Sequence, residues 1–171
     1  MTSFRKIFTA IISFLLLVGS ACQSKKADSI PQLLRQLEKD SIALEKIQQQ
    51  YPARMQTNFR WCDSMLQFIP EEQIGECFDV LNLAQAYLRQ FDETVPVMKH
   101  TLSYTKQQLT NLQNDIDTKF ISDSLAAIYL NDEIAVADTL HNRILYFQDR
   151  LSQQDKELTS LMGTISKATS K

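Results

Sequence analysis

Apolar residues recur along most of the chain at alternating spacings of three and four, which is the pattern of amphipathic helices that pack along one face. Three such stripes run over 30–69, 74–116 and 126–165. No stretch shows the strict two-residue alternation of a half-buried strand. The stripes have similar lengths and short segments separate them. The sequence therefore predicts an all-α protein, specifically a long antiparallel three-helix coiled-coil bundle.

Two prolines lie inside these stripes. Pro52 falls in the first stripe and Pro96 in the second. Proline removes a backbone donor and bends a helix. The three-four spacing keeps its phase across both positions, which favours bent helices over separate ones. We therefore expect one helix over 71–118 with a kink near Pro96, and we keep a four-helix bundle as the alternative.

The segments between the stripes carry helix stop and start signals. "IPEEQ" at 69–73 places a proline and two glutamates at a helix start, where acidic side chains complement the positive helix end. "FISDS" at 120–124 supplies Ser122 or Asp123 as a helix cap. Few polar residues interrupt the stripes themselves. The main interruptions, which we expect to set register or to face outward at a bend, are Ser41, Gln48, Asn58, Thr105 and Glu133.

Cys62 and Cys77 lie seven residues before and seven residues after Ile69–Pro70. In an antiparallel hairpin such residues sit at the same height, and both belong to stripes. A disulfide is the expected result in an oxidising compartment. A redox pair or a metal site is the alternative, but there is no CxxC motif and no neighbouring histidine.

Residues 1–21 have the order of a targeting segment: cationic Arg5 and Lys6, a short apolar run, then small residues. A cysteine follows at once in "LLLVGSAC". This stretch resembles the signal of bacterial lipoproteins, in which an aliphatic and two small residues precede the cysteine, although Gly19 stands where leucine is usual. The resemblance implies that Cys22 carries a diacylglyceryl thioether and an acylated amino group, with chains such as palmitate. An ordinary secretory cut is the alternative.

This interpretation divides the chain into a signal peptide (1–21), a short tether (22–29), a helical bundle domain (30–167) and a frayed tail (168–171). Gln23 after the cysteine suggests, by analogy with enteric sorting, the outer membrane. We expect a cell-envelope protein that faces the periplasm. The start of the first helix and the second turn would lie near the membrane.

The charge of the chain narrows its partners. The net charge is −2, and it falls to −4 without residues 1–21, which carry Arg5 and Lys6 and no acid. A mildly acidic chain without a basic block argues against a nucleic-acid partner. The chain has only three glycines, too few for the glycine-rich loops that bind phosphate groups. We expect no cofactor.

The spacing of one acidic residue and one histidine is similar to that of metal ligands in a di-iron helical bundle. Asp138 and His141 are three residues apart, as in half of a di-iron bundle motif. The second half fails because Val97, not an acid, stands three before His100. We interpret Asp138 and His141 as a surface pair, and we expect no metal site and no catalytic residues.

A second apolar band accompanies the third stripe. It is either additional core or a docking surface for a partner helix or the membrane. Its members are Leu125, Ile128, Tyr129, Ile134 and Val136.

A short motif, Asp-Ser/Thr-aliphatic, occurs five times and resembles the O-glycosylation acceptor pattern of exported proteins in one Gram-negative phylum. Local capping by solvated polar residues is the alternative. Ser41, in the second copy along the chain, lies on a core stripe and suits modification poorly. The candidate acceptors are Ser29, Ser64, Ser124 and Thr139.

Together these features predict a non-enzymatic, lipid-anchored spacer, adaptor or assembly factor with an envelope protein as partner. One alternative is a ligand-binding or catalytic bundle with a polar pocket around Asn58, Thr105 or Glu133. Another is a periplasmic chaperone, which the acidic, anchored chain disfavours.

Overall fold

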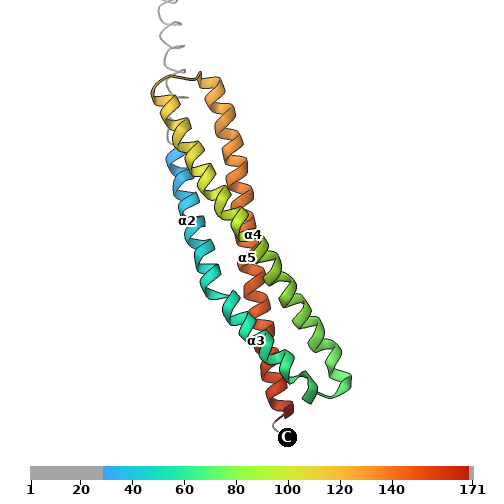
Figure 1. Ribbon diagram of the computed structural model, residues 1–171. Coiled ribbons are helices and arrows are strands. Elements are labelled where there is room, and N and C mark those ends of the chain that lie inside the picture. Colours follow the sequence, from blue (N-terminus) through green and yellow to red (C-terminus); the bar gives the residue numbers. More distant parts are fainter. Residues whose placement is uncertain (1–28, 170–171) are drawn as a thin grey trace, which may run out of the picture. The chain divides into compact units, whose positions relative to one another are not determined.

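The computed structural model describes residues 29–169, and within them the protein is all-helical, with its helices packed together and without a strand. Figure 1 follows the chain from α2 to α5. The predicted all-α class is therefore confirmed. The elements are α2 (Ser29–Gln50), α3 (Pro52–Met65), the 3-10 helix η1 (Leu66–Phe68), α4 (Glu71–Asp117) and α5 (Asp123–Thr169).

The chain forms two compact units, and the long helices pass from one to the other. The first unit contains the start of α2 up to Glu38 together with Tyr104–Ala137, which includes the end of α4 and the start of α5. The second unit contains Lys39–Ser103 and the rest of α5 from Asp138. We describe the two units separately.

The core follows the predicted stripes. Every stripe position is buried or half-buried, and the polar stripe residue Thr105 is fully buried. The largest fully buried side chains include Phe91 and Phe147 in the second unit and Leu109 in the first. Burial of apolar area at about 25 cal/mol per Å² is what holds such helices together. The apolar spacing therefore located the core correctly.

At Pro52 the structure differs from the expected single bent helix. Tyr51 interrupts the helix for one residue, and α3 begins at the proline. The backbone amide of Tyr51 still donates to Ile47, and that of Met55 donates to Tyr51. Proline disfavours helical backbone at the residue before it, which explains a break at Tyr51. Because the hydrogen bonds resume within one turn, the stripe keeps its phase.

At Pro96, by contrast, α4 is continuous, as expected. The first turn between helices also matches expectation. The 3-10 helix η1 ends α3, Ile69 is extended, and α4 begins at Glu71 with two glutamates in its first turn. These carboxylates complement the positive end of the helix.

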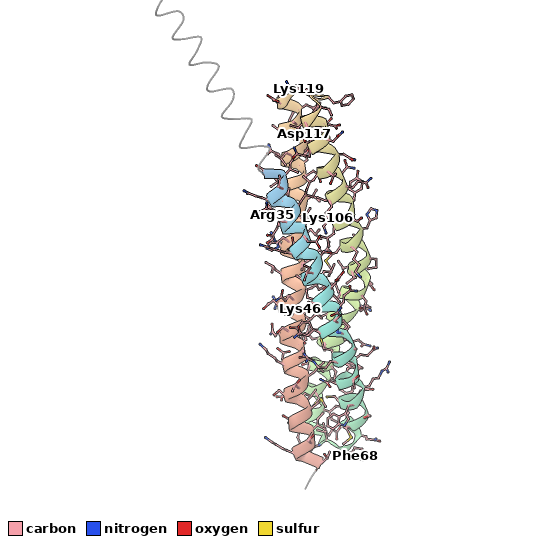
Figure 2. All side chains as sticks on the ribbon, turned by 90° about the vertical axis from the view of Figure 1, so that its left-hand side faces the viewer. Arg35, Lys46, Phe68, Lys106, Asp117 and Lys119 are labelled. Atoms are coloured by element: carbon pink, nitrogen blue, oxygen red, sulfur yellow. The ribbon has the colours of Figure 1, made fainter. Side chains whose placement is uncertain are left out.

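The second turn, in the first unit, has a defined hydrogen-bond pattern. The amide of Phe120 donates to the carbonyl of Asp115 at 2.8 Å, and that of Lys119 donates to Ile116 at 3.1 Å. This is the Schellman C-cap, with Lys119 in the left-handed region at φ 54°. Ser122 then caps α5, because its Oγ accepts from the amide of Leu125 at 3.4 Å. Figure 2 shows Lys119 and Asp117 at this end of α4.

The boundaries shift slightly at the ends of the described chain. Helix α2 begins at Ser29, inside the expected tether, and α5 continues to Thr169, two residues into the expected frayed tail. The predicted signal peptide and the rest of the tether lie outside the described residues.

Candidate functional site

Cys62 on α3 and Cys77 on α4 are both buried in the second unit, as their stripe positions predict. They are free thiols in the structure, so the predicted disulfide is not formed there and stays a prediction. Burial, and then the nearby Cys77, raise the pKa of Cys62 from 9.0 to about 11. Burial, and then Glu76, also raise the pKa of Cys77. Thiols whose pKa is raised stay neutral at neutral pH and are poor nucleophiles.

His141 is not the surface partner of Asp138. Its Nδ1 lies 2.7 Å from Oδ1 of Asp40 on α2, and Asp138 is exposed. Asp40 itself is buried, although the stripe ran through the adjacent Ser41, which is half-buried. A buried carboxylate requires hydrogen-bond partners. The pairing therefore joins two helices rather than two residues of one helix.

A second buried carboxylate in the same unit has a similar arrangement. Arg54 on α3 donates from Nε and from an Nη to the two carboxylate oxygens of Asp155 on α5, at 2.9 and 2.6 Å. The Asp155 side chain is 12% exposed and that of Arg54 is 51% exposed. The guanidinium also lies 5.8 Å from the ring centre of Tyr51. This two-bond geometry fixes the contact more tightly than a single ion pair does.

An aromatic cluster continues from the core to the surface of the second unit. The rings of Phe91 and Phe147 meet edge to face at 5.3 Å, and Tyr146 lies 5.4 Å from Phe147. Arg150 covers the Tyr146 ring at 5.7 Å. Exposed tyrosine beside arginine is a composition that protein interfaces favour.

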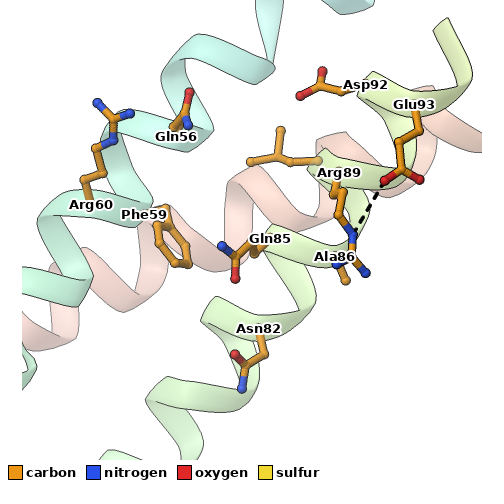
Figure 3. Close-up of a pocket in the computed structure, with 10 residues that line it drawn as sticks. Gln56, Phe59, Arg60, Asn82, Gln85, Ala86, Arg89, Asp92 and Glu93 are labelled. Carbon is orange, nitrogen blue, oxygen red and sulfur yellow. Dashed lines mark ion pairs between the residues drawn. The ribbon is translucent and has the colours of Figure 1, made fainter.

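The largest hollow that we describe is a groove of about 630 Å³ between α3 and α4 in the second unit. Figure 3 shows side chains of α3 facing those of α4 across it, with an Arg89–Glu93 ion pair at 4.0 Å. Half-buried Phe59 and Leu88 are its apolar members. The remaining lining residues are all exposed: Gln56, Arg60, Asn82, Gln85, Ala86, Arg89, Asp92 and Glu93. A groove of this kind does not enclose a small molecule.

A smaller hollow of about 220 Å³ lies in the first unit between α4 and α5. Glu133 lines it, and burial, and then Asp132, raise the pKa of Glu133. Neither Asn58 nor Thr105 lines this hollow or the groove. The polar pocket that would favour a ligand-binding or catalytic bundle therefore does not form around these three residues in either hollow.

Among residues 29–169, no group of three or more histidine, cysteine, aspartate or glutamate side chains is placed to hold a metal ion. Within the same residues, no helix is long and apolar enough to cross a membrane. Cys22, the predicted lipid attachment point, lies outside the described residues.

The second apolar band on α5 is only partly covered. Ile128, Tyr129 and Val136 are exposed, and Leu125 and Ile134 are half-buried. Water therefore reaches this surface, and its role as a docking surface stays a prediction.

The candidate glycosylation residues differ in exposure. Ser64, Ser124 and Thr139 are exposed and Ser29 is half-buried. Ser64 Oγ donates to the carbonyl of Trp61, which fits local capping as well as an acceptor role. Their modification stays a prediction.

Sequence reasoning missed the buried carboxylates Asp40 and Asp155. A signal for both was present, because each is adjacent to a polar stripe residue, Ser41 and Gln154 respectively. The exposed groove had no signal in the apolar spacing, since its lining depends on which helices become neighbours.

Comparison of the chain with protein families, with curated proteins and with solved structures finds no match.

Proposed function

We propose that this chain is a lipid-anchored, non-enzymatic helical protein of the bacterial cell envelope that acts as a spacer, adaptor or assembly factor. The observation that carries this proposal is Cys22, placed directly after a cationic, apolar and small-residue segment and before a wholly helical body. Acyl chains on that cysteine would hold the helices at a membrane surface.

We also propose the finer architecture, an antiparallel three-helix coiled coil with bends at the prolines. Two contacts in the second unit support it. Asp40 pairs with His141 and Arg54 with Asp155, and in each pair the residues are 101 apart. A constant separation is what parallel neighbours give, as expected for the first and third helices of an up-down-up bundle.

The membrane is proposed to be the outer one, with the helices in the periplasm and an envelope protein as partner. Gln23 supports the location by analogy, and the net charge of −2 supports a partner other than nucleic acid. Two surfaces are available for that partner: the exposed part of the second apolar band and the α3–α4 groove.

Oxidation of Cys62 and Cys77 to a disulfide belongs to the same proposal. The first turn joins the two helices that carry them, and both thiols are buried there. Exported proteins meet an oxidising compartment, in which such a bridge forms and persists.

A Cys22→Ser variant tests the anchor. We expect it to leave the membrane fraction and to lose metabolic labelling by a palmitate analogue. Cys62→Ser is the matched control, because it removes a cysteine from the helical body and should keep both properties. Tight membrane association of the Cys22→Ser variant would contradict the proposal.

Cross-linking mass spectrometry on intact envelopes tests the adaptor role. We expect reproducible links between one envelope protein and either 121–136, which carries the band, or 56–93, which carries the groove. Links confined to the chain itself would contradict an adaptor role and would leave a passive spacer.

A further inference from the structure

Phe120 is the most exposed of the large apolar side chains in the described part of the chain, at 81%. It lies in the turn between α4 and α5, inside the first unit. A phenylalanine ring in water forgoes the free energy that its burial would contribute. Because single exposed apolar side chains are common on protein surfaces, the place of Phe120 in the fold has to indicate what covers it.

The exposure of Phe120 does not come from a loose backbone. Its amide is held by Asp115 and the preceding amide by Ile116, in the Schellman pattern. The residue at this position usually packs against the helix three or four residues before the helix end. Those residues are Asp115 and Asn114, which are polar. The ring is thus presented from a fixed backbone without its usual apolar neighbour.

The turn lies at the same end of the first unit as Ser29, where α2 begins. In the sequence, Cys22 stands seven residues before Ser29. Glu38 on α2 and Lys106 on α4 are joined by an ion pair of 2.6 Å and mark one level of this unit. From that level α2 extends about 14 Å back to Ser29, and α4 extends about 17 Å to its last residue. Figure 1 shows both segments ending on the same side of this unit. The turn therefore reaches at least as far as the start of α2.

The chain between Cys22 and Ser29 limits how far this end can move from an anchor. Seven residues span at most about 25 Å when fully extended. We propose that Phe120 inserts its ring into the interface of the bilayer that holds the acyl chains of Cys22, with the Lys119 ammonium at the headgroups. This inference rests on the proposed lipidation.

The charges around the turn define the lipid surface. Lys119 can extend its aliphatic stem along the membrane and keep its charge in water. Asp117 and Asp123 flank the turn, so a strongly anionic surface would repel it. The surface expected is therefore zwitterionic. The second unit supplies a comparable exposed residue, Phe68, which is 59% exposed.

The test uses the full lipidated protein in phosphatidylcholine–phosphatidylethanolamine vesicles. A Trp61→Phe background removes the single native tryptophan. Phe120→Trp or, as the matched control, Phe68→Trp then introduces a reporter. With phosphatidylcholine brominated near the headgroup, we expect about twofold stronger quenching and a blue-shifted emission for Phe120→Trp, because an interfacial indole lies among acyl chains.

Equal, weak quenching of both variants would overturn the inference while the anchor stands. Release of the Cys22→Ser chain confirms the anchor separately, and its retention would contradict the proposed function instead. A photoactivatable lipid in the same vesicles, with the unsubstituted chain, provides a second readout. Lipid adducts at 117–123 support the inference, and the absence of lipid adducts there would overturn it.

Discussion

In the second unit two buried carboxylates each meet a basic side chain from a neighbouring helix, whereas in the first unit the ion pair lies at the surface. Asp155 is 12% exposed and receives Arg54, while Glu38 in the first unit is 64% exposed and receives Lys106. The first unit instead buries Thr105, whose hydroxyl has no hydrogen-bond partner.

This difference concerns how the helices are kept in register. A buried carboxylate that loses its partner is costly, so a shifted pairing of α3 with α5 is strongly disfavoured. An exposed pair can exchange its partner for water at little cost. The second unit therefore specifies its helix alignment through polar contacts, and the first relies on apolar packing.

The largest effect that we expect is the stabilisation of the second unit by a disulfide between Cys62 and Cys77. In the disulfide, each thiol loses a proton and the pair gives two electrons to an oxidised dithiol protein, which is reduced by thiol–disulfide exchange. Closing this short loop should raise the free energy of unfolding by about 3 kcal/mol in the loop-entropy estimate. Urea unfolding with and without reductant measures it, and Cys62→Ala should abolish the difference.

The free energy of unfolding of the reduced protein should depend on pH. The pKa of Cys62 is about 11 when folded and 9.0 as its ordinary value, so between those pH values the unfolded chain binds fewer protons. The free energy of unfolding of the reduced chain should therefore fall as the pH rises from 9 toward 11. Cys62→Ala should weaken this decrease.

The disulfide prediction has its own contradicting outcome. Identical urea unfolding of the oxidised and the reduced chains would contradict the Cys62–Cys77 disulfide.

Removing the basic partner of the buried Asp155 should destabilise the second unit. The loss should be larger than the loss in the first unit when the basic partner of the exposed Glu38 is removed. Arg54→Ala leaves the Asp155 carboxylate buried without its guanidinium, which should cost about 1–3 kcal/mol. Lys106→Ala, the matched control, should cost at most about 1 kcal/mol because Glu38 is largely solvated. Chemical unfolding of both variants checks this. Equal losses would remove the distinction between the units.

Thr105→Val should stabilise the first unit. It replaces a buried hydroxyl without a partner by a methyl group of similar size, with a gain of about 1 kcal/mol. Thr94 on the same helix is the control, since its Oγ1 donates to the carbonyl of Gln90 at 2.6 Å. Thr94→Val should be neutral or destabilising in thermal unfolding. A loss for Thr105→Val would indicate that its hydroxyl is satisfied after all.

The smallest stabilisation that we expect is at the turn between α4 and α5 in the first unit. Lys119 has φ 54°, which a glycine adopts without the cost that a side chain brings. Lys119→Gly should raise the free energy of unfolding by about 0.5–1 kcal/mol. Thr118→Gly, one residue earlier, has no such strain to relieve and should be destabilising. Thermal unfolding that ranks the two variants in the opposite order would contradict the cap assignment.

Several features of the fold were predictable because they depend on local spacing. The apolar stripes located the buried residues, and Ser122 was correctly among the expected caps of α5. The break at Tyr51 was not foreseen, since the stripe keeps its phase whether the helix bends or stops for one residue. Lys119 in a left-handed conformation was also missed, because glycine is the usual signal for that position.

The linear order of residues was enough to determine the helical class, the buried face of each helix and the positions of its main turns, because helix periodicity and caps are properties of neighbouring residues. The partners of Asp40 and Asp155, the α3–α4 groove and the fixed exposure of Phe120 were decided only by the tertiary structure. Each of these joins residues from different helices or depends on which apolar surfaces remain uncovered. Spacing within one helix carries no information about a neighbour 101 residues away.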